Sequence, residues 1–183
     1  MAKKIFIFII FSLFISSSSF SETESIKDLQ KGGKIVLIRH ALAPGGGDPP
    51  EFKLDDCTTQ RNLDSEGINQ SKRIGLFFLK NQIPIDKVLS SEWCRCKDTA
   101  RFAFKNFDTF NALNSFFDER FKKNKIKKIN DLKDFLKKWD SKKNLILITH
   151  YVVILELTNK AVTSGEIVIL DKNLNFIGSI NYI

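Results

Sequence analysis

The chain has 183 residues, of which 43% are hydrophobic and 27% charged, and its formal net charge is +8. A chain of this length can bury a hydrophobic core as one domain, which excludes a need for metal or several disulfides to hold the fold. The positive balance favours anionic partners such as phosphate esters. Many of the lysines are scattered over residues 122–140, as on a solvated helix face, so the charge does not indicate a nucleic-acid-binding protein.

The N-terminus has the layout of a secretory signal peptide. Two lysines form a basic start, and residues 5–15 form an apolar run broken by one serine. This run is shorter than the roughly 20 residues that a membrane-spanning helix needs. Small residues at Ser19 and Ser21 predict cleavage after Ser21. The alternative is an uncleaved N-terminal anchor. We therefore expect a signal peptide over 1–21 and one domain over 22–183, exported to the periplasm or secreted, with no membrane span after signal removal.

Strand-like and helix-like segments alternate along the rest of the chain. The strands are continuous apolar runs of the kind buried on both faces of a sheet. This alternation predicts a three-layer α/β/α sandwich with a largely parallel central sheet. In chain order we expect a short helix over 26–30, a strand over 34–38, a long loop over 41–61, a helix from Asp64 or Ser65 to 81, a strand over 86–90, a helix over 94–104, a strand or turn over 112–117, a helix over 129–139, a strand over 145–149, a helix over 151–158, and a hairpin over 166–170 and 175–182.

The two histidines of the chain occupy equivalent positions. His40 follows the apolar run "IVLI" and Arg39, and His150 follows "LILIT". Both therefore lie at the carboxyl end of a strand that we expect to be central, and this edge of an open α/β sheet is where ligands bind. A single histidine at a strand end is usually structural, but the placement of both favours a functional site.

Four motifs in this order resemble the histidine phosphatase superfamily, in its phosphoglycerate-mutase-like branch. The family opens with a strand that ends in Arg-His, here Arg39-His40, and continues with R-x-L-[ST]-x-x-G, here "RNLDSEG" from Arg61. Its third motif, SS-x-x-x-R-x-x-x-TA, corresponds to "SSEWCRCKDTA" around Arg95, and its second histidine ends a late strand, here "LILITH". The pattern is most similar to an exported bacterial subgroup. The sequence departs from the family pattern in four places. Ala41 and Tyr151 replace the usual glycines, Asp64 stands where Ser or Thr is common, and the loop Gly45-Gly46-Gly47 lacks the usual Asn.

The resemblance implies a nucleophile, a second imidazole and arginines that bind phosphate. His40 is the expected nucleophile, since neighbouring cations keep an imidazole unprotonated and able to attack phosphorus. Arg39 and Arg95 can each donate paired hydrogen bonds to phosphate oxygens. His150 would donate to the phosphoryl group in the transition state, and Arg61 is a further substrate-binding candidate. A basic site of this kind needs no metal and no cofactor.

The proton donor to the leaving group is less well defined by the sequence. Many relatives use an acid after the arginine motif, and the best-placed acids here are Asp118 and Glu119. Small phosphohistidine phosphatases of the family work without such an acid. The alternatives are therefore Asp118, Glu119 or neither.

Three functions remain open. The first is a metal-independent, exported phosphatase that hydrolyses a phosphorylated small molecule or an envelope phosphosugar through a phosphohistidine on His40. The second is a protein phosphohistidine phosphatase. The third is a non-catalytic phosphate-binding envelope module, supported by Ala41 and Tyr151. We expect substrate specificity to lie in the segments 44–59 and 105–117, which no motif constrains.

The three cysteines allow one disulfide and one free thiol in an exported chain. If the fold brings Arg61 and Arg95 to one phosphate, as the resemblance implies, it also brings the cysteine-bearing segments together. We therefore expect a disulfide from Cys57 to Cys94 or Cys96, with Cys94 preferred. The alternative is three free thiols packed as small hydrophobic groups.

Overall fold

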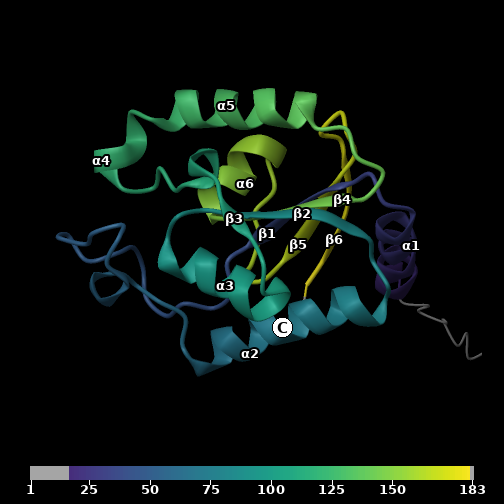
Figure 1. Ribbon diagram of the computed structural model, residues 1–183, viewed down its shortest axis with the longest axis horizontal. Helices are drawn as coiled ribbons and strands as arrows, with labels where there is room; N and C mark the ends of the chain where they lie inside the picture. Colours follow the sequence, from purple (N-terminus) through teal and green to yellow (C-terminus); the bar gives the residue numbers. More distant parts are fainter. Residues whose placement is uncertain (1–16, 182–183) are drawn as a thin grey trace, which may run out of the picture.

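The computed structural model describes residues 17–181, with side chains from residue 22. A six-stranded sheet in the order β3-β2-β4-β1-β5-β6 forms the centre (Figure 1). Strands β3, β2, β4 and β1 are parallel, β5 is antiparallel to β1, and β6 is antiparallel to β5. The strands are β1 Ile35–Arg39, β2 Ile85–Ser90, β3 Asp108–Thr109, β4 Asn144–Thr149, β5 Ile167–Leu170 and β6 Phe176–Ile180.

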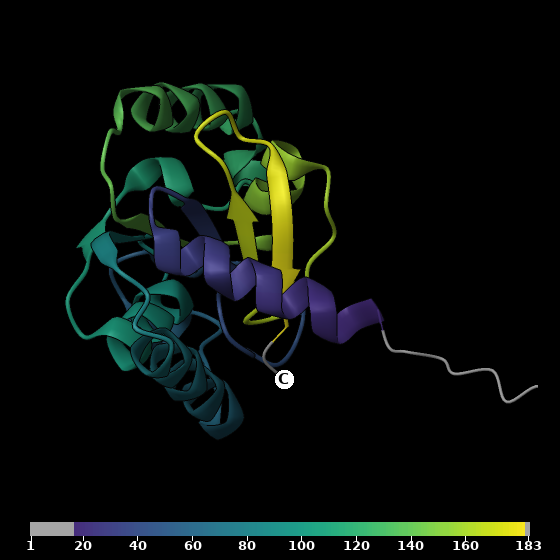
Figure 2. The same ribbon diagram turned by 90° about the vertical axis from the view of Figure 1, so that its right-hand side faces the viewer.

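Helices cover both faces of this sheet. Helices α2 and α3 lie on one face and α5 and α6 on the other (Figure 1), while α1 packs beside β6 at the edge of the sheet (Figure 2). The predicted three-layer fold is therefore confirmed. The helices are α1 Ser17–Lys31, α2 Ser65–Lys80, α3 Cys94–Phe104, α4 Glu119–Lys122, α5 Lys125–Lys138 and α6 Tyr151–Thr158, with 3₁₀ turns at Cys57–Thr59 and Asn111–Leu113.

The core follows from the two central strands. All six residues of β4 and the first four of β1 are buried, because each strand has a neighbour on both sides and helices on both faces. Alternate side chains point to opposite faces. One face packs against α1, α2 and α3, where Ile74 is fully buried, and the other against α5 and α6, where Leu132 is fully buried.

Most element boundaries agree with the pattern of the sequence, and the differences have local causes. Helix α2 begins at Ser65, since the Asp64 carboxylate accepts a hydrogen bond from the Gly67 amide at 2.8 Å and caps it. Helix α5 begins four residues earlier than expected, at Lys125, in a stretch whose polar residues hide the periodicity. The segment 112–117 forms a 3₁₀ turn and extended chain under α5 rather than a strand, and β3 was not expected because two residues carry no periodic signal.

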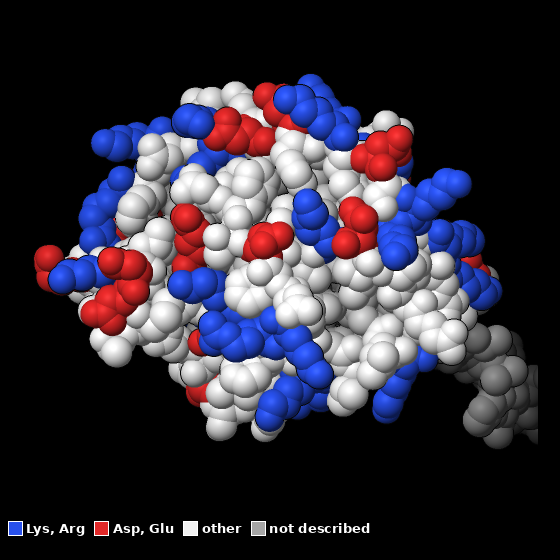
Figure 3. Space-filling view, in the orientation of Figure 1, with Lys and Arg blue, Asp and Glu red and all other residues white. Residues whose placement is uncertain are grey.

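The predicted signal peptide falls largely on residues 1–16, outside the described residues. Within 17–181, no helix has the length and apolar character required to cross a membrane. Helix α1 contains the short helix expected over 26–30, and its buried side chains Ser25 and Leu29 pack against the domain. On the face seen in Figure 3, Lys and Arg side chains are spread over the surface with Asp and Glu among them.

Candidate active site

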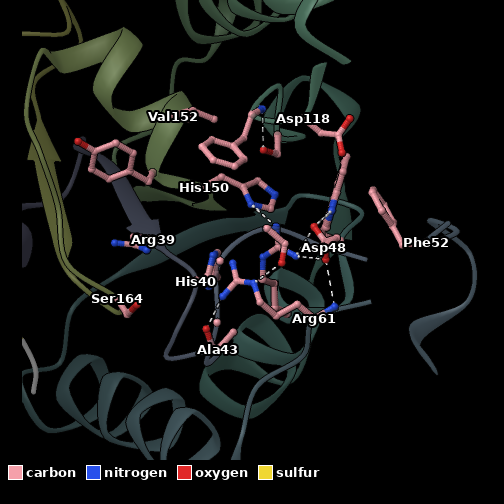
Figure 4. Close-up of a pocket in the computed structure, with 18 of the residues that line it drawn as sticks. Arg39, His40, Ala43, Asp48, Phe52, Arg61, Asp118, His150, Val152 and Ser164 are labelled. Carbon is pink, nitrogen blue, oxygen red and sulfur yellow. Dashed lines mark hydrogen bonds and ion pairs between the residues drawn. The ribbon is translucent and has the colours of Figure 1, made fainter. Parts of the chain in front are cut away.

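The two histidines meet at the carboxyl end of the parallel strands. Strands β1 and β4 pair in register as far as Arg39 opposite Thr149, and the His40 amide then donates to the Thr149 carbonyl at 2.9 Å. Each histidine follows its strand by one residue, so the strand pairing sets their separation. The ring centroids of His40 and His150 lie 5.6 Å apart, with their planes at 67° (Figure 4).

His40 is held in a form suited to nucleophilic attack. Its Nδ1 lies 2.8 Å from the backbone carbonyl oxygen of Ala41. A carbonyl oxygen only accepts, so Nδ1 carries the proton and Nε2 keeps its lone pair. The ring is 3% exposed. Burial, and then the cations Arg95, Arg39 and Arg61, hold the pKa of His40 well below its usual value, although the bond to Ala41 opposes this shift. The imidazole is therefore neutral at pH 7.

Three arginines from different elements surround this edge of the sheet. Arg39 ends β1, Arg95 lies in the first turn of α3, and Arg61 precedes α2. Among the residues that the structure describes, the buried Nε atoms of Arg39 and Arg95 have no hydrogen-bond partner. An unpartnered buried donor is costly, and both arginines line the pocket, where their guanidinium groups add positive charge. Arg39 Nη1 donates to the Val162 carbonyl oxygen at 2.8 Å, and the Arg61 guanidinium donates to the carbonyl oxygens of Ala43 and, at 2.9 Å, Gly47.

Asp48 is a site residue that the sequence did not reveal. Its carboxylate pairs with Arg95 Nη1 at 2.8 and 3.1 Å and accepts from the Trp93 indole at 3.1 Å and the Arg61 amide at 3.0 Å. Both side chains of the Asp48–Arg95 pair are at least nine-tenths buried. Removing one partner of such a pair leaves a buried charge uncompensated. Asp48 therefore fixes Arg95 and joins the glycine-rich loop to α3. The only sequence signal was a carboxylate inside a loop between two arginine-bearing motifs.

His150 lies on the other side of Arg95. Its Nδ1 is 3.4 Å from Arg95 Nη2, and its Nε2 is 2.8 Å from the Ser91 hydroxyl oxygen. The indole of Trp93 packs against the imidazole with its centroid at 5.3 Å. Burial, and then Arg95 and His40, hold the pKa of His150 well below its usual value. Both histidines are thus neutral and both face a cationic pocket.

The two candidate proton donors line the pocket but are bound to neighbouring cations. The Asp118 carboxylate accepts hydrogen bonds from the guanidinium and amide of Arg120, which lower its pKa and keep it ionised at neutral pH. Glu119 is largely exposed and pairs with Lys122 at 2.8 Å. In the described part of the chain, neither acid hydrogen-bonds to His40 or His150.

The pocket over these groups has a volume of about 770 Å³. Aromatic side chains form much of one wall, where Phe52 packs against Trp93 and Phe121. Both segments expected to set specificity contribute to the lining. The segment 44–59 contributes residues 44–48 and Phe52, and the segment 105–117 contributes Ser115 and Phe117. The rest of the lining consists of Arg39, His40, Leu42, Ala43, Arg61, Trp93, Arg95, Asp118, Glu119, Phe121, His150, Tyr151, Val152 and Ser164.

A disulfide joins the loop that carries Asp48 and Arg61 to α3. It joins Cys57 to Cys94, the pair preferred from the sequence, with the Cα atoms 5.6 Å apart. Cys96 is a buried thiol whose pKa is raised to about 12 by burial. Within residues 17–181, no group of three His, Cys, Asp or Glu side chains is arranged to hold a metal ion.

Comparison by sequence finds no matching protein-family model and no matching curated protein. Comparison by structure finds similar folds. The protein histidine phosphatase SixA complexed with tungstate matches with a TM-score of 0.59 and 16% identity, over 81% of this chain and 96% of that chain. A candidate phosphohistidine phosphatase SixA from Agrobacterium tumefaciens matches with a TM-score of 0.56 and 17% identity, over 81% and 97%. A phosphoserine phosphatase from Entamoeba histolytica, bound to phosphoserine, matches with 0.51 and 16%, over 74% and 89%. The chain therefore shares the fold of these solved phosphatase structures.

Proposed function

We propose that this protein is a metal-independent phosphatase that works through a phosphohistidine on His40. The observation that carries the proposal is the hydrogen bond from His40 Nδ1 to the Ala41 carbonyl, which leaves Nε2 with its lone pair in a pocket of arginines. The named activities of the structural neighbours support it.

The chemistry follows from these groups. Nε2 of His40 attacks phosphorus, the ester P–O bond breaks, and the leaving oxygen takes up one proton from solvent. Water then cleaves the P–N bond, which releases phosphate and restores the imidazole. The guanidinium groups of Arg39 and Arg95, which line the pocket, would bind the equatorial oxygens, where charge develops. Because Asp118 and Glu119 are paired to cations, the proposal assigns the leaving-group proton to neither.

The proposed substrate is a phosphorylated small molecule, such as an envelope phosphosugar, since the pocket of about 770 Å³ has room for more than the phosphoryl group. A protein phosphohistidine is the second candidate. The SixA structures favour it by name, and Phe117, which is 69% exposed at the pocket, could contact a polypeptide.

The test is turnover of p-nitrophenyl phosphate in EDTA, next to a phosphohistidine peptide and a panel of sugar phosphates. We expect turnover in EDTA, and we expect His40→Ala to abolish both turnover and acid-labile radiophosphate labelling while the circular dichroism spectrum is unchanged. Substantial turnover by His40→Ala would identify another nucleophile. Phosphate binding without labelling of the wild-type protein would support the non-catalytic module.

We also propose that residues 1–21 are removed during export to the periplasm or medium. The oxidised pair Cys57–Cys94 supports an oxidising compartment. Mass spectrometry of the protein from cell fractions tests this proposal. A mature N-terminus at Glu22 in the periplasm or medium is expected, and an intact chain confined to the cytoplasm would contradict it.

A further inference from the structure

The ring nitrogens of His150 face groups of opposite hydrogen-bonding character. Nδ1 lies 3.4 Å from Arg95 Nη2, and guanidinium nitrogens only donate. A proton on Nδ1 would therefore point at another N–H, so Arg95 disfavours that tautomer. The other tautomer carries its proton on Nε2, which lies 2.8 Å from the Ser91 hydroxyl oxygen.

The hydroxyl of Ser91 is in turn oriented by Asn114. Its oxygen lies 3.0 Å from Asn114 Oδ1. The amide of Asn114 has a defined orientation, because Oδ1 also accepts from the Glu92 backbone N–H at 2.8 Å while Nδ2 donates to the Glu92 carboxylate. The Ser91 hydrogen is thus directed to Asn114, and its oxygen is left to accept from His150.

The surroundings leave little room for another arrangement. Ser91 is fully buried and Asn114 is 2% exposed, so bulk water does not compete for these bonds. The Trp93 amide donates to the second lone pair of the Ser91 oxygen at 3.3 Å. Cys96 lies 3.5 Å from His150 Nε2, but its thiol can donate to the Thr149 carbonyl at 3.7 Å.

We propose that Ser91 and Asn114 are positioning residues that hold His150 in the Nε2–H tautomer, with its Nδ1 lone pair facing Arg95 and the phosphate pocket. Their chemical role rests on the proposed function. His150 would enter the reaction as an acceptor at Nδ1. It could donate to a phosphoryl oxygen only after Nδ1 has taken a proton, either from a singly protonated phosphate ester or from solvent.

The tautomer can be observed directly, because the chain contains only two histidines. Long-range ¹H–¹⁵N correlation spectra of the ¹⁵N-labelled protein distinguish protonated from unprotonated ring nitrogens, and His40→Ala assigns the signals of His150. We expect opposite tautomers at pH 7, with the proton on Nδ1 of His40 and on Nε2 of His150. A wild-type spectrum with the His150 proton on Nδ1 would overturn the proposal without the use of any Ser91 or Asn114 variant.

Ser91→Ala and Ser90→Ala form a matched pair for the role of the hydroxyl. Both serines are fully buried, but the Ser90 hydroxyl donates to the Ser91 carbonyl at 2.8 Å, away from His150. We expect Ser91→Ala to mix the tautomers of His150 and to lower kcat about tenfold or more with a smaller change in KM. Ser90→Ala should change neither the tautomer nor kcat.

The two readouts separate this inference from the proposed function. An unchanged His150 spectrum in folded Ser91→Ala would contradict the positioning role even if the protein is a phosphatase. The expected tautomer in a protein that hydrolyses no phosphate ester would leave the positioning role intact and overturn the function. If Ser91→Ala does not fold, Asn114→Ala tests the next hydrogen bond in the series from His150 through Ser91 to Asn114. We expect this variant also to mix the tautomers of His150, and an unchanged His150 spectrum would contradict the positioning role.

Discussion

Arg95 makes the contacts by which the site can be tested most directly. One of its nitrogens pairs with Asp48, another faces His150, and its Nε is buried without a partner in the described structure. Lysine has a single ammonium nitrogen and no planar fork, so it cannot reproduce contacts that separate guanidinium nitrogens make. We therefore expect Arg95→Lys to lower kcat/KM at least tenfold, which corresponds to about 1.4 kcal/mol.

The control for this substitution lies on the same helix. Arg101 is exposed and pairs with Asp98, so Arg101→Lys should leave kcat/KM unchanged. Steady-state kinetics of both variants on one phosphate ester makes the comparison. A loss below tenfold for Arg95→Lys would show that Arg95 does not bind the phosphoryl group in the transition state.

The two buried histidines predict the stability of the protein in mild acid. Their folded pKa values lie well below 6.5, so below about pH 6.5 the unfolded chain binds protons that the folded chain does not. The free energy of unfolding should fall as the pH drops from about 6.5 to 5, above the range where carboxylates titrate. The slope is at most about 1.4 kcal/mol per pH unit for each histidine.

Urea unfolding at several pH values between 7 and 5 measures this slope. His40→Asn removes one of the two titrating groups, so the slope should be about half that of the wild-type protein. A free energy of unfolding that does not change over this pH range would mean that the histidines bind protons in the folded state as readily as in the unfolded chain.

Residues of the site differed in how well the sequence revealed them. The sequence marks four of them: Arg39, His40 and His150 end apolar runs, and Arg95 lies within a motif. Asp48 and Asn114 acquire their roles only through tertiary contacts, since Asp48 meets Arg95 across 47 positions and Asn114 meets Ser91 across 23. Ser91 belongs to the motif around Arg95, but the motif does not reveal that its hydroxyl contacts His150.

At the scale of the elements, the N-terminus of α2 must approach the pocket loop closely. A Cβ added to Gly67 would lie 2.0 Å from the Leu42 carbonyl oxygen, so the helix and the loop could not keep their positions. We expect Gly67→Ala to lower the free energy of unfolding by about 1–3 kcal/mol, the range for overpacking, and to lower activity. Gly46→Ala is the control, because nothing lies within 4 Å of its added Cβ, and it should not destabilise the fold. Equal unfolding midpoints for the two variants would contradict this interpretation of the contact.

The same scale shows which elements a sequence can define. Continuous apolar runs revealed β1 and β4, because strands buried on both faces need apolar residues at every position. The two-residue strand β3 and the four-residue helix α4 are too short for any periodicity. Both depend on neighbouring elements for their conformation.

At the scale of the whole molecule, the disulfide connects activity to the redox state. The bond joins two cysteines that lie 37 positions apart in the sequence. It holds the loop that carries Asp48 and Arg61 against α3. The chain-entropy model gives such a crosslink about 3–4 kcal/mol of stability. Reduction should therefore lower activity at temperatures where the domain is still folded.

The measurement is activity and far-ultraviolet circular dichroism in parallel, with and without dithiothreitol. A Cys57→Ser/Cys94→Ser double variant should resemble the reduced wild-type protein and should not respond to the reductant. Full activity of the reduced protein up to its unfolding temperature would show that the crosslink contributes only to stability.

The pairing of β1 with β4 fixes the separation of the two histidines independently of the loops that line the pocket. The distance between the two histidines is set by main-chain register, whereas much of the pocket wall comes from the segments 44–52 and 115–121, which belong to no strand of the sheet. Substitutions in these walls can alter which molecule fits without moving the reacting pair. The sheet thus holds the two histidines while the loops shape the rest of the pocket, so exchanging 49–52 and 115–121, with Asp48 kept to hold Arg95, is a direct route to a new substrate preference.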